Sequence, residues 1–102
     1  MKSCNVQELE TLVEDGWQII DVREPLEIFE MRAAYNAVNV PLGSLEDEIG
    51  KLDASKKYIL MCRSGIRSAT ACDILEKHNF KHLLNCEGGI LAFNDLNKDT
   101  QE

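Results

Sequence analysis

A cysteine followed by a short polar loop stands beyond the middle of the chain. Residues Tyr58 to Met61 form a continuous apolar run that predicts a buried strand, and Cys62 follows it directly. The loop combines positive charge, hydroxyl groups and backbone freedom in its next residues, which are Arg63, Ser64, Gly65, Ile66, Arg67 and Ser68. A helix is predicted from about Ser68 to His78. The sequence therefore places a thiol where a strand passes through a tight loop into a helix.

Such a loop can form a cradle for an anion. A helix N-terminus presents unpaired N–H groups, and a tight loop adds further converging donors. Gly65 permits backbone angles that a side chain would prevent, the serines can donate hydroxyl hydrogen bonds, and the arginines stay charged. These groups favour a thiolate, so we expect a lowered pKa and a nucleophilic sulfur at Cys62. The alternative interpretation is an ordinary buried cysteine beside solvated arginines.

The rest of the chain alternates between short apolar strands and amphipathic helices. Strands are predicted at 18–22, 37–40, 58–61 and 82–85, and helices at 6–14, 25–31, 45–52, 68–78 and 89–96. This alternation is typical of an α/β domain with a mainly parallel sheet, whose sites form at the carboxyl ends of the strands. We expect a single domain over 1–102, with its core at about 6–96 and a frayed polar tail at 97–102.

Composition and charge exclude several classes of function. The 102 residues carry a formal net charge of −7, which argues against nucleic acid and anionic membranes as partners. No apolar run is long enough to span a membrane, and residues 1–10 do not resemble a secretory signal, so we expect a cytoplasmic protein. The four cysteines contain no close pair, and His78 and His82 do not complete a zinc site. We therefore expect neither a disulfide framework nor a metal.

Four segments in order carry a family resemblance. They are Ile19 to Glu24 with Glu27, Ala37 to Leu42, Cys62 to Ser68, and Glu87 to Ile90. Together they resemble the motifs of a single-domain rhodanese, a sulfurtransferase, over about residues 6–96. The resemblance implies a rhodanese-like fold, with a single five-stranded, mainly parallel sheet flanked by helices. It also implies that Cys62 takes the outer sulfur of a donor such as thiosulfate, becomes a persulfide, and passes the sulfur to cyanide or another thiophilic acceptor.

The resemblance also suggests roles for the neighbouring residues. Arg63 to Ser68 would bind the small anionic donor, without metal or organic cofactor. Arg63 suits an inorganic anion, since relatives specific for mercaptopyruvate typically carry glycine there. Asp21 and Arg23 resemble the family's Asp-x-Arg segment and would brace the neighbouring loops.

Other interpretations stay open. The chain could be a persulfide carrier or regulatory module that serves a protein acceptor, with little thiosulfate turnover. A cysteine-dependent phosphatase or arsenate reductase is disfavoured, because related phosphatases have one more residue between cysteine and arginine. The segment Arg32 to Asn36 lacks the family's usual histidine and glycines, and Phe93 replaces a common tryptophan.

The remaining cysteines have separate expectations. We expect Cys72 to pack against the sheet and Cys4 to be incidental. Cys86 ends the strand after the Cys62 helix and is a candidate relay or resolving thiol for Cys62.

Overall fold

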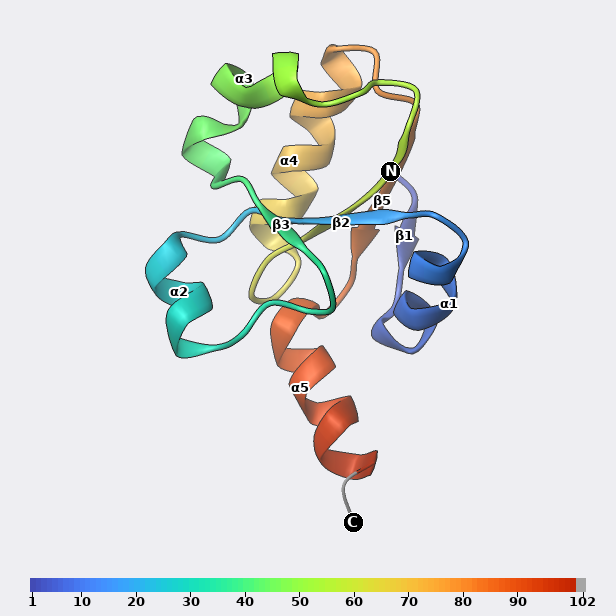
Figure 1. The fold of residues 1–102 in the computed structure, drawn as a ribbon, viewed down its shortest axis with the longest axis vertical. Helices are drawn as coiled ribbons and strands as arrows, with labels where there is room; N and C mark the ends of the chain where they lie inside the picture. The colour runs from blue at the N-terminus through green and yellow to red at the C-terminus, as the bar shows by residue number, and fades with distance from the viewer. Residues whose placement is uncertain (101–102) are drawn as a thin grey trace.

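All five strands of the sheet run parallel, as the alternating pattern and the resemblance predicted. The computed structural model describes residues 1–100. The strands are β1 (Ser3–Cys4), β2 (Gln18–Asp21), β3 (Val38–Asn39), β4 (Lys57–Met61) and β5 (His82–Cys86). They lie side by side in the order β1-β5-β4-β2-β3. Figure 1 shows the strands with the helices around them. The predicted α/β fold with a five-stranded parallel sheet is confirmed.

Within residues 1–100, five α-helices and three short 3₁₀ turns accompany these strands, and the last helix follows β5. The α-helices are α1 (Leu9–Glu14), α2 (Pro25–Glu30), α3 (Leu45–Glu48), α4 (Ile66–Lys77) and α5 (Gly89–Thr100). The 3₁₀ turns are η1 (Val6–Glu8), η2 (Leu42–Ser44) and η3 (Ile49–Lys51). The described residues contain no helix long and apolar enough to cross a lipid bilayer.

Several elements differ from the sequence-based expectations, and the helix expected at 6–14 is divided into η1 and α1. The two-residue strand β1 was not predicted, because so short a strand shows no periodic pattern. The helix expected at 45–52 is split into α3 and η3. Helix α5 continues past Leu96 to Thr100, and the last two residues of the expected tail, 101–102, lie outside the described residues.

The sheet separates two apolar clusters. Alternate residues of β4 enter different clusters: Leu60 packs with Leu75 of α4, whereas Ile59 packs with Leu9 of α1 and Ile90 of α5. All five of these side chains are fully buried. Burial on both faces explains why β4 is continuously apolar, and it fixes the position of the loop that follows.

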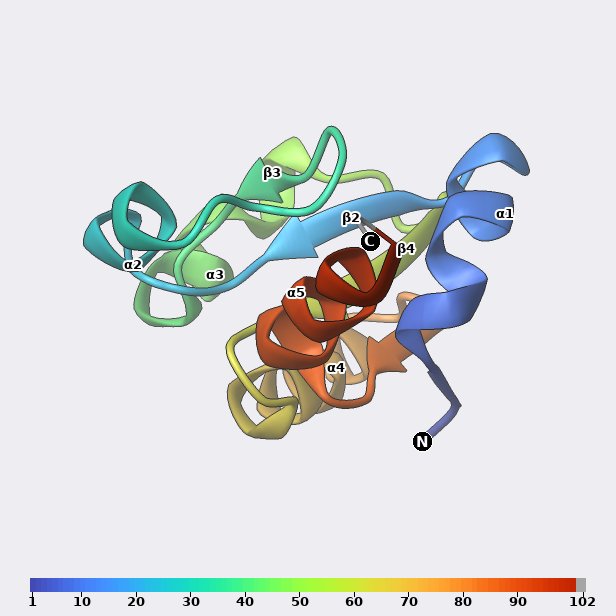
Figure 2. The same cartoon turned by 90° about the horizontal axis from the view of Figure 1, so that it is seen from below.

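The carboxyl ends of the three central strands meet at one edge of the sheet. Asp21 at the end of β2 is paired with Met61 at the end of β4, and Leu60 is paired with Asn85 of β5. In Figure 2, β2 points away from α1 and towards α2. The residues that follow β2, β4 and β5 are thereby brought together, with Cys62 between the other two segments.

Candidate functional site

The thiol of Cys62 is surrounded by hydrogen-bond donors from its own loop. The backbone N–H of Gly65 donates to Sγ at 3.1 Å, and that of Ser68 donates at 3.4 Å. The Ser68 hydroxyl lies 3.4 Å from the same sulfur. Cys62 itself is only 1% exposed, so these donors surround a largely dehydrated sulfur. The loop thus provides converging partners for a negative charge on sulfur.

These contacts change the acidity of the thiol. Burial alone acts to raise the pKa of Cys62, because a desolvated thiolate is disfavoured. The contact with the Ser68 hydroxyl, and hydrogen bonds from the N–H groups of Ser68, Gly65 and Ser64, act in the opposite direction. Their combined effect is larger, and the pKa of Cys62 is lowered from its ordinary value. A lowered pKa in a site with anion donors is typical of a nucleophilic cysteine.

The backbone of Gly65 makes the tight turn that aims these donors. Gly65 has a φ of +107° and is the N-cap of α4, which begins at Ile66, earlier than the predicted start. A side chain would be strained at this φ. A Cβ there would also lie 3.5 Å from the Cys86 carbonyl oxygen, so the turn is closely packed against the end of β5.

A buried amide from β5 supports the loop. Asn85 is 8% exposed; its side-chain N–H donates to the Gly65 carbonyl at 3.1 Å, and its Oδ1 accepts the Ser68 hydroxyl at 2.5 Å. Sequence reasoning missed this residue. The signal that could have found it is a single polar residue inside the apolar strand HLLNC, since buried polar groups are normally hydrogen-bonded.

The second arginine of the loop, Arg67, forms an ion pair with Glu27 of α2. Arg67 donates from its two terminal nitrogens to the Glu27 carboxylate, with both distances at 2.7 Å. The hydrogen bond from Arg67 is the main cause that lowers the pKa of Glu27 to about 2, and the same hydrogen bond raises the pKa of Arg67. Arg67 was expected to bind the donor, whereas the structure places its guanidinium on Glu27, whose role was not assigned from the sequence.

The other loop side chains point towards solvent. Arg63, Ser64 and Ile66 are exposed, with Ile66 76% accessible. Among the side chains of residues 1–97, none forms an ion pair with the guanidinium of Arg63. Ser64 contributes its backbone N–H to Cys62. Arg63 is therefore the loop residue whose charge remains available to an anionic donor.

The Asp-x-Arg segment braces α2 against the sheet edge. Asp21 and Arg23 are both buried and form an ion pair at 2.8 Å. Arg23 also donates to the backbone carbonyls of Met31 at 2.9 Å and Glu27 at 3.3 Å. Removing either partner would leave a buried charge uncompensated. Such a change typically lowers the free energy of unfolding by about 3–5 kcal/mol. The segment acts on the site indirectly, because it fixes the helix that presents Glu27.

The start of α5 closes the other side of the loop. The N–H of Ile90 donates to the Cys62 carbonyl at 2.9 Å, and that of Leu91 donates to the Arg63 carbonyl at 3.1 Å. Gly89 makes this approach feasible, since a Cβ at that position would collide with the Cys62 carbonyl oxygen and lie 2.6 Å from that of Arg63. Packing against the cysteine loop therefore requires a glycine at position 89, whereas a Cβ at Gly88 would lie 2.7 Å from Cβ of Ala92.

The altered segment before β3 is held against α5. Tyr35 adopts a φ of +46°, and its ring packs edge-on against Phe93 with centroids 5.4 Å apart. Ala34 beside it is fully buried. The aromatic residue that replaces the usual tryptophan thus contacts the segment that departs from the family pattern.

The other buried cysteines differ from Cys62 in their surroundings. Cys72 packs in the same apolar cluster as Cys62, and burial raises its pKa to about 12. Cys86 belongs to the cluster on the opposite face, together with Cys4. The candidate resolving role of Cys86 towards Cys62 is therefore unfavourable, because the sheet lies between the two side chains.

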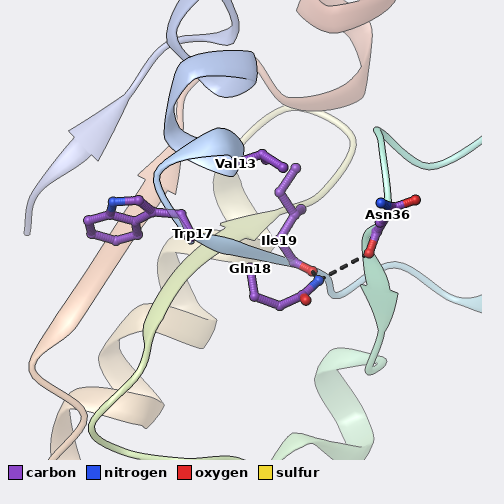
Figure 3. Close-up of a pocket in the computed structure, with 6 residues that line it drawn as sticks. Val13, Trp17, Gln18, Ile19 and Asn36 are labelled. Atoms are coloured by element: carbon purple, nitrogen blue, oxygen red, sulfur yellow. Dashed lines mark hydrogen bonds between the residues drawn. The ribbon is translucent and has the colours of Figure 1, made fainter.

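A separate cavity of about 220 Å³ opens at the amino end of β2 (Figure 3). Its lining residues are Val13, Gly16, Trp17, Gln18, Ile19 and Asn36. The Gln18 amide donates to the Asn36 carbonyl at 3.0 Å across it. None of the lining side chains is a nucleophile or an acid–base group, so this cavity lacks the chemistry present at Cys62. The side chains that the structure describes, those of residues 1–97, contain no group of three or more potential metal ligands.

Comparison with known proteins gives one consistent result. The family model of the rhodanese-like domain matches residues 5–96. The chain is 39% identical over 75 residues to "Putative sulfurtransferase YtwF" of Bacillus subtilis, covering 74% of this chain and 71% of that protein. It is 31% identical over 77 residues to "Putative sulfur carrier protein YrkF" of the same organism, covering 76% of this chain and 41% of that protein.

The fold comparison agrees with the sequence comparison. The crystal structure of a rhodanese-related protein from Thermoplasma volcanium superposes with a TM-score of 0.85 at 29% identity. The superposition covers 94% of this chain and 93% of that chain.

Proposed function

Because the chain belongs to the rhodanese-like family of sulfurtransferases, we propose that it moves a sulfane sulfur from thiosulfate or a similar donor through a persulfide on Cys62. The observation that carries this proposal is the set of loop donors around the Cys62 sulfur. They stabilise the thiolate before the reaction and can stabilise a persulfide anion after it.

The first half-reaction forms the persulfide. The Cys62 thiolate attacks the sulfane sulfur of thiosulfate, a new S–S bond forms, and the donor's own S–S bond breaks to release sulfite. The exposed guanidinium of Arg63 lies in the same loop and attracts the sulfonate end of the dianion. A largely buried Cys62 limits contact of the persulfide with bulk water.

The second half-reaction returns the thiolate. The terminal sulfur of the persulfide is transferred to cyanide or another thiophilic acceptor, and the electron pair of the Cys62–sulfur bond stays on Cys62. Neither step requires a metal or an organic cofactor, since sulfur provides both nucleophile and leaving group. The four cysteines of the chain are free thiols, which suits the reducing cytoplasm as the place of the reaction.

A persulfide carrier is the second candidate function. Two observations favour it: similarity to a protein named as a sulfur carrier, and the unusual Arg32 to Asn36 segment packed through Tyr35 onto Phe93. In this alternative the same Cys62 persulfide forms, but a thiol of a partner protein accepts the sulfur. The two candidates share the first half-reaction and differ in the acceptor.

Thiocyanate formation separates enzyme from carrier. Purified protein is mixed with thiosulfate and cyanide, with Cys62→Ser and Cys72→Ser as variants. We expect turnover by the wild type and by Cys72→Ser, and none by Cys62→Ser. Equal rates for the wild type and Cys62→Ser would contradict the proposal. A wild type that accumulates one persulfide without turnover would support the carrier.

A further inference from the structure

A second pair of thiols lies on the other face of the sheet. Strands β1 and β5 are neighbours in the sheet (Figure 1), and Cys4 of β1 and Cys86 of β5 are direct partners in their parallel register. Both side chains belong to the apolar cluster under α1 and α5, whereas Cys62 and Cys72 belong to the cluster on the opposite face. The pair is therefore separated by the sheet from the proposed site of sulfur transfer.

The register brings the two cysteines within disulfide range. Neighbouring strands lie about 4.8 Å apart, and directly paired residues of parallel strands project to the same face. Disulfides join Cα atoms that are about 4.4–6.8 Å apart. The two thiols interact strongly enough to shift the pKa of each other in opposite directions. The two thiols can therefore be joined with little movement of the backbone.

The two thiols differ in acidity. The hydrogen bond shared with Cys86 lowers the pKa of Cys4 in spite of its burial, and the same contact raises the pKa of Cys86. Cys4 is therefore the better nucleophile of the pair, and Cys86 keeps its proton. A thiolate beside a protonated second thiol is the arrangement that leads to a disulfide after oxidation.

A hollow is lined by residues that are adjacent in sequence to the two cysteines. Its volume is about 470 Å³, and its lining includes the residues that follow each cysteine, namely Asn5, Val6, Gln7, Glu87 and Gly88, with Ala92, Asp95 and Leu96 of α5. Cys4 is 5% exposed, and β1 is an edge strand of two residues that pairs only with β5 in the described sheet. Short edge strands open locally at low cost in free energy, which gives a small oxidant access to Cys4.

We propose that Cys4 and Cys86 form a second redox site, which a hydroperoxide oxidises to an intramolecular disulfide. The Cys4 thiolate attacks the terminal peroxide oxygen, the O–O bond breaks, and Cys4 becomes a sulfenic acid. The other oxygen leaves as hydroxide or alkoxide and takes up the proton that the Cys4 thiol had released to solvent, which gives water or alcohol. The sulfur of Cys86 then attacks the sulfenic sulfur, the S–O bond breaks, and a second water leaves with the thiol proton. Two thiols lose two electrons, and one peroxide gains them.

The disulfide would link the edge strand to the strand that supports the Cys62 loop. Cys86 is adjacent to Asn85, which holds Gly65 and Ser68. Closing a loop from residue 4 to residue 86 constrains most of the unfolded chain, so oxidation should raise the thermal unfolding midpoint by about 5 °C or more. This inference does not depend on the sulfur transfer proposed above.

The test uses the full chain carrying Cys62→Ser, so that oxidation at Cys62 does not contribute. Hydrogen peroxide is added in slight excess, and the intact mass is measured. We expect a loss of about 2 Da that dithiothreitol reverses. Tryptic digestion without reductant should give one linked species that joins peptide 3–23 to peptide 82–98.

Further substitutions in the Cys62→Ser protein test whether Cys4 and Cys86 are the two oxidised residues. Cys4→Ser and Cys86→Val should each abolish the mass loss and the rise in the unfolding midpoint, and Cys86→Val keeps an apolar side chain in the core. Cys72→Ser removes a buried thiol from the opposite face and should retain both effects. The proposal is overturned by an unchanged mass, by a mass loss that persists in Cys4→Ser, or by oxygen adducts without the linked peptide.

Discussion

The guanidinium of Arg67 donates two hydrogen bonds of 2.7 Å to the carboxylate of Glu27, which joins the start of α4 to α2. The two side chains are 37% and 32% exposed, so solvent screens the ion pair. We expect it to stabilise the fold by about 1 kcal/mol or less. Its larger effect is to fix Arg67 beside the Cys62 loop, while Arg63 remains exposed.

Replacing Glu27 by Gln tests this ion pair through its pH dependence. The pKa of Glu27 is lowered to about 2 from an ordinary 4.5, so its carboxylate is favoured in the folded state. The stabilisation is complete above the ordinary pKa and is lost as the pH falls towards 2. The urea midpoint of Glu27→Gln should lie below that of the wild type at pH 7 and converge with it near pH 2. Glu30→Gln on the same helix is the control, and equal midpoints at pH 7 for all three proteins would refute the prediction.

Replacing Ser68 by Ala tests the hydroxyl contact to Cys62. The hydroxyl carries one proton, which it donates to Asn85 in the structure, and it can turn that proton to the Cys62 sulfur when the thiolate forms. Loss of this hydrogen bond is worth about 1 kcal/mol, so the pKa of Cys62 should rise and less thiolate should be present at pH 7. We expect alkylation of Cys62 by iodoacetamide to slow by about fivefold at pH 7 and to recover at higher pH. Ser64→Ala is the matched control, because Ser64 donates through its backbone. Equal slowing by both variants would argue against a specific role of the Ser68 hydroxyl.

Replacing Asn85 by Leu tests the support from β5. The change leaves the Ser68 hydroxyl and the Gly65 carbonyl without their partner, which should cost about 2 kcal/mol in the free energy of unfolding. The pKa of Cys62, read from the pH profile of alkylation, should also rise. Asn94→Ala on α5 is the control and should leave that profile unchanged. A destabilised Asn85→Leu with an unaltered profile would limit Asn85 to a structural role.

Replacing Gly89 by Ala tests the contact between α5 and the cysteine loop. The new Cβ would collide with the Cys62 carbonyl oxygen, and the residue has a φ of +55°. We expect a loss of about 2 kcal/mol or more in the free energy of unfolding, together with slower sulfur transfer. Gly50→Ala introduces the same methyl group where nothing lies within 4 Å and should change stability little. Similar urea midpoints for the two variants would show that the close packing at Gly89 is unimportant.

Local sequence patterns predicted most of the fold. The apolar run of β4 indicates a buried strand, and the amphipathic repeat of α4 indicates a helix with one buried face. The elements and their parallel arrangement could therefore be predicted from the sequence. Strand β1 could not be predicted, because its position depends on hydrogen bonds to β5, more than 80 residues away in the chain.

Only the part of the site that lies within the Cys62 loop could be predicted from the sequence. Cys62, Gly65 and Ser68 lie within one short loop, where residue types and spacing carry the information. The contacts of Glu27 with Arg67 and of Asn85 with Ser68 join residues 40 and 17 positions apart, and only the folded sheet brings them together. Sequence reasoning therefore identified Arg67 as a positive charge and had no means to find its carboxylate partner.

The most direct test of the account is the mass of the protein after incubation with thiosulfate alone. We predict that the wild type gains about 32 Da, the mass of one sulfur, and that this gain lies on the tryptic peptide 58–63 that contains Cys62. Cyanide should remove the added mass, and Cys62→Ser should show no gain. A folded wild type that gains no mass, or a Cys62→Ser variant that gains the same mass, would contradict a persulfide on Cys62.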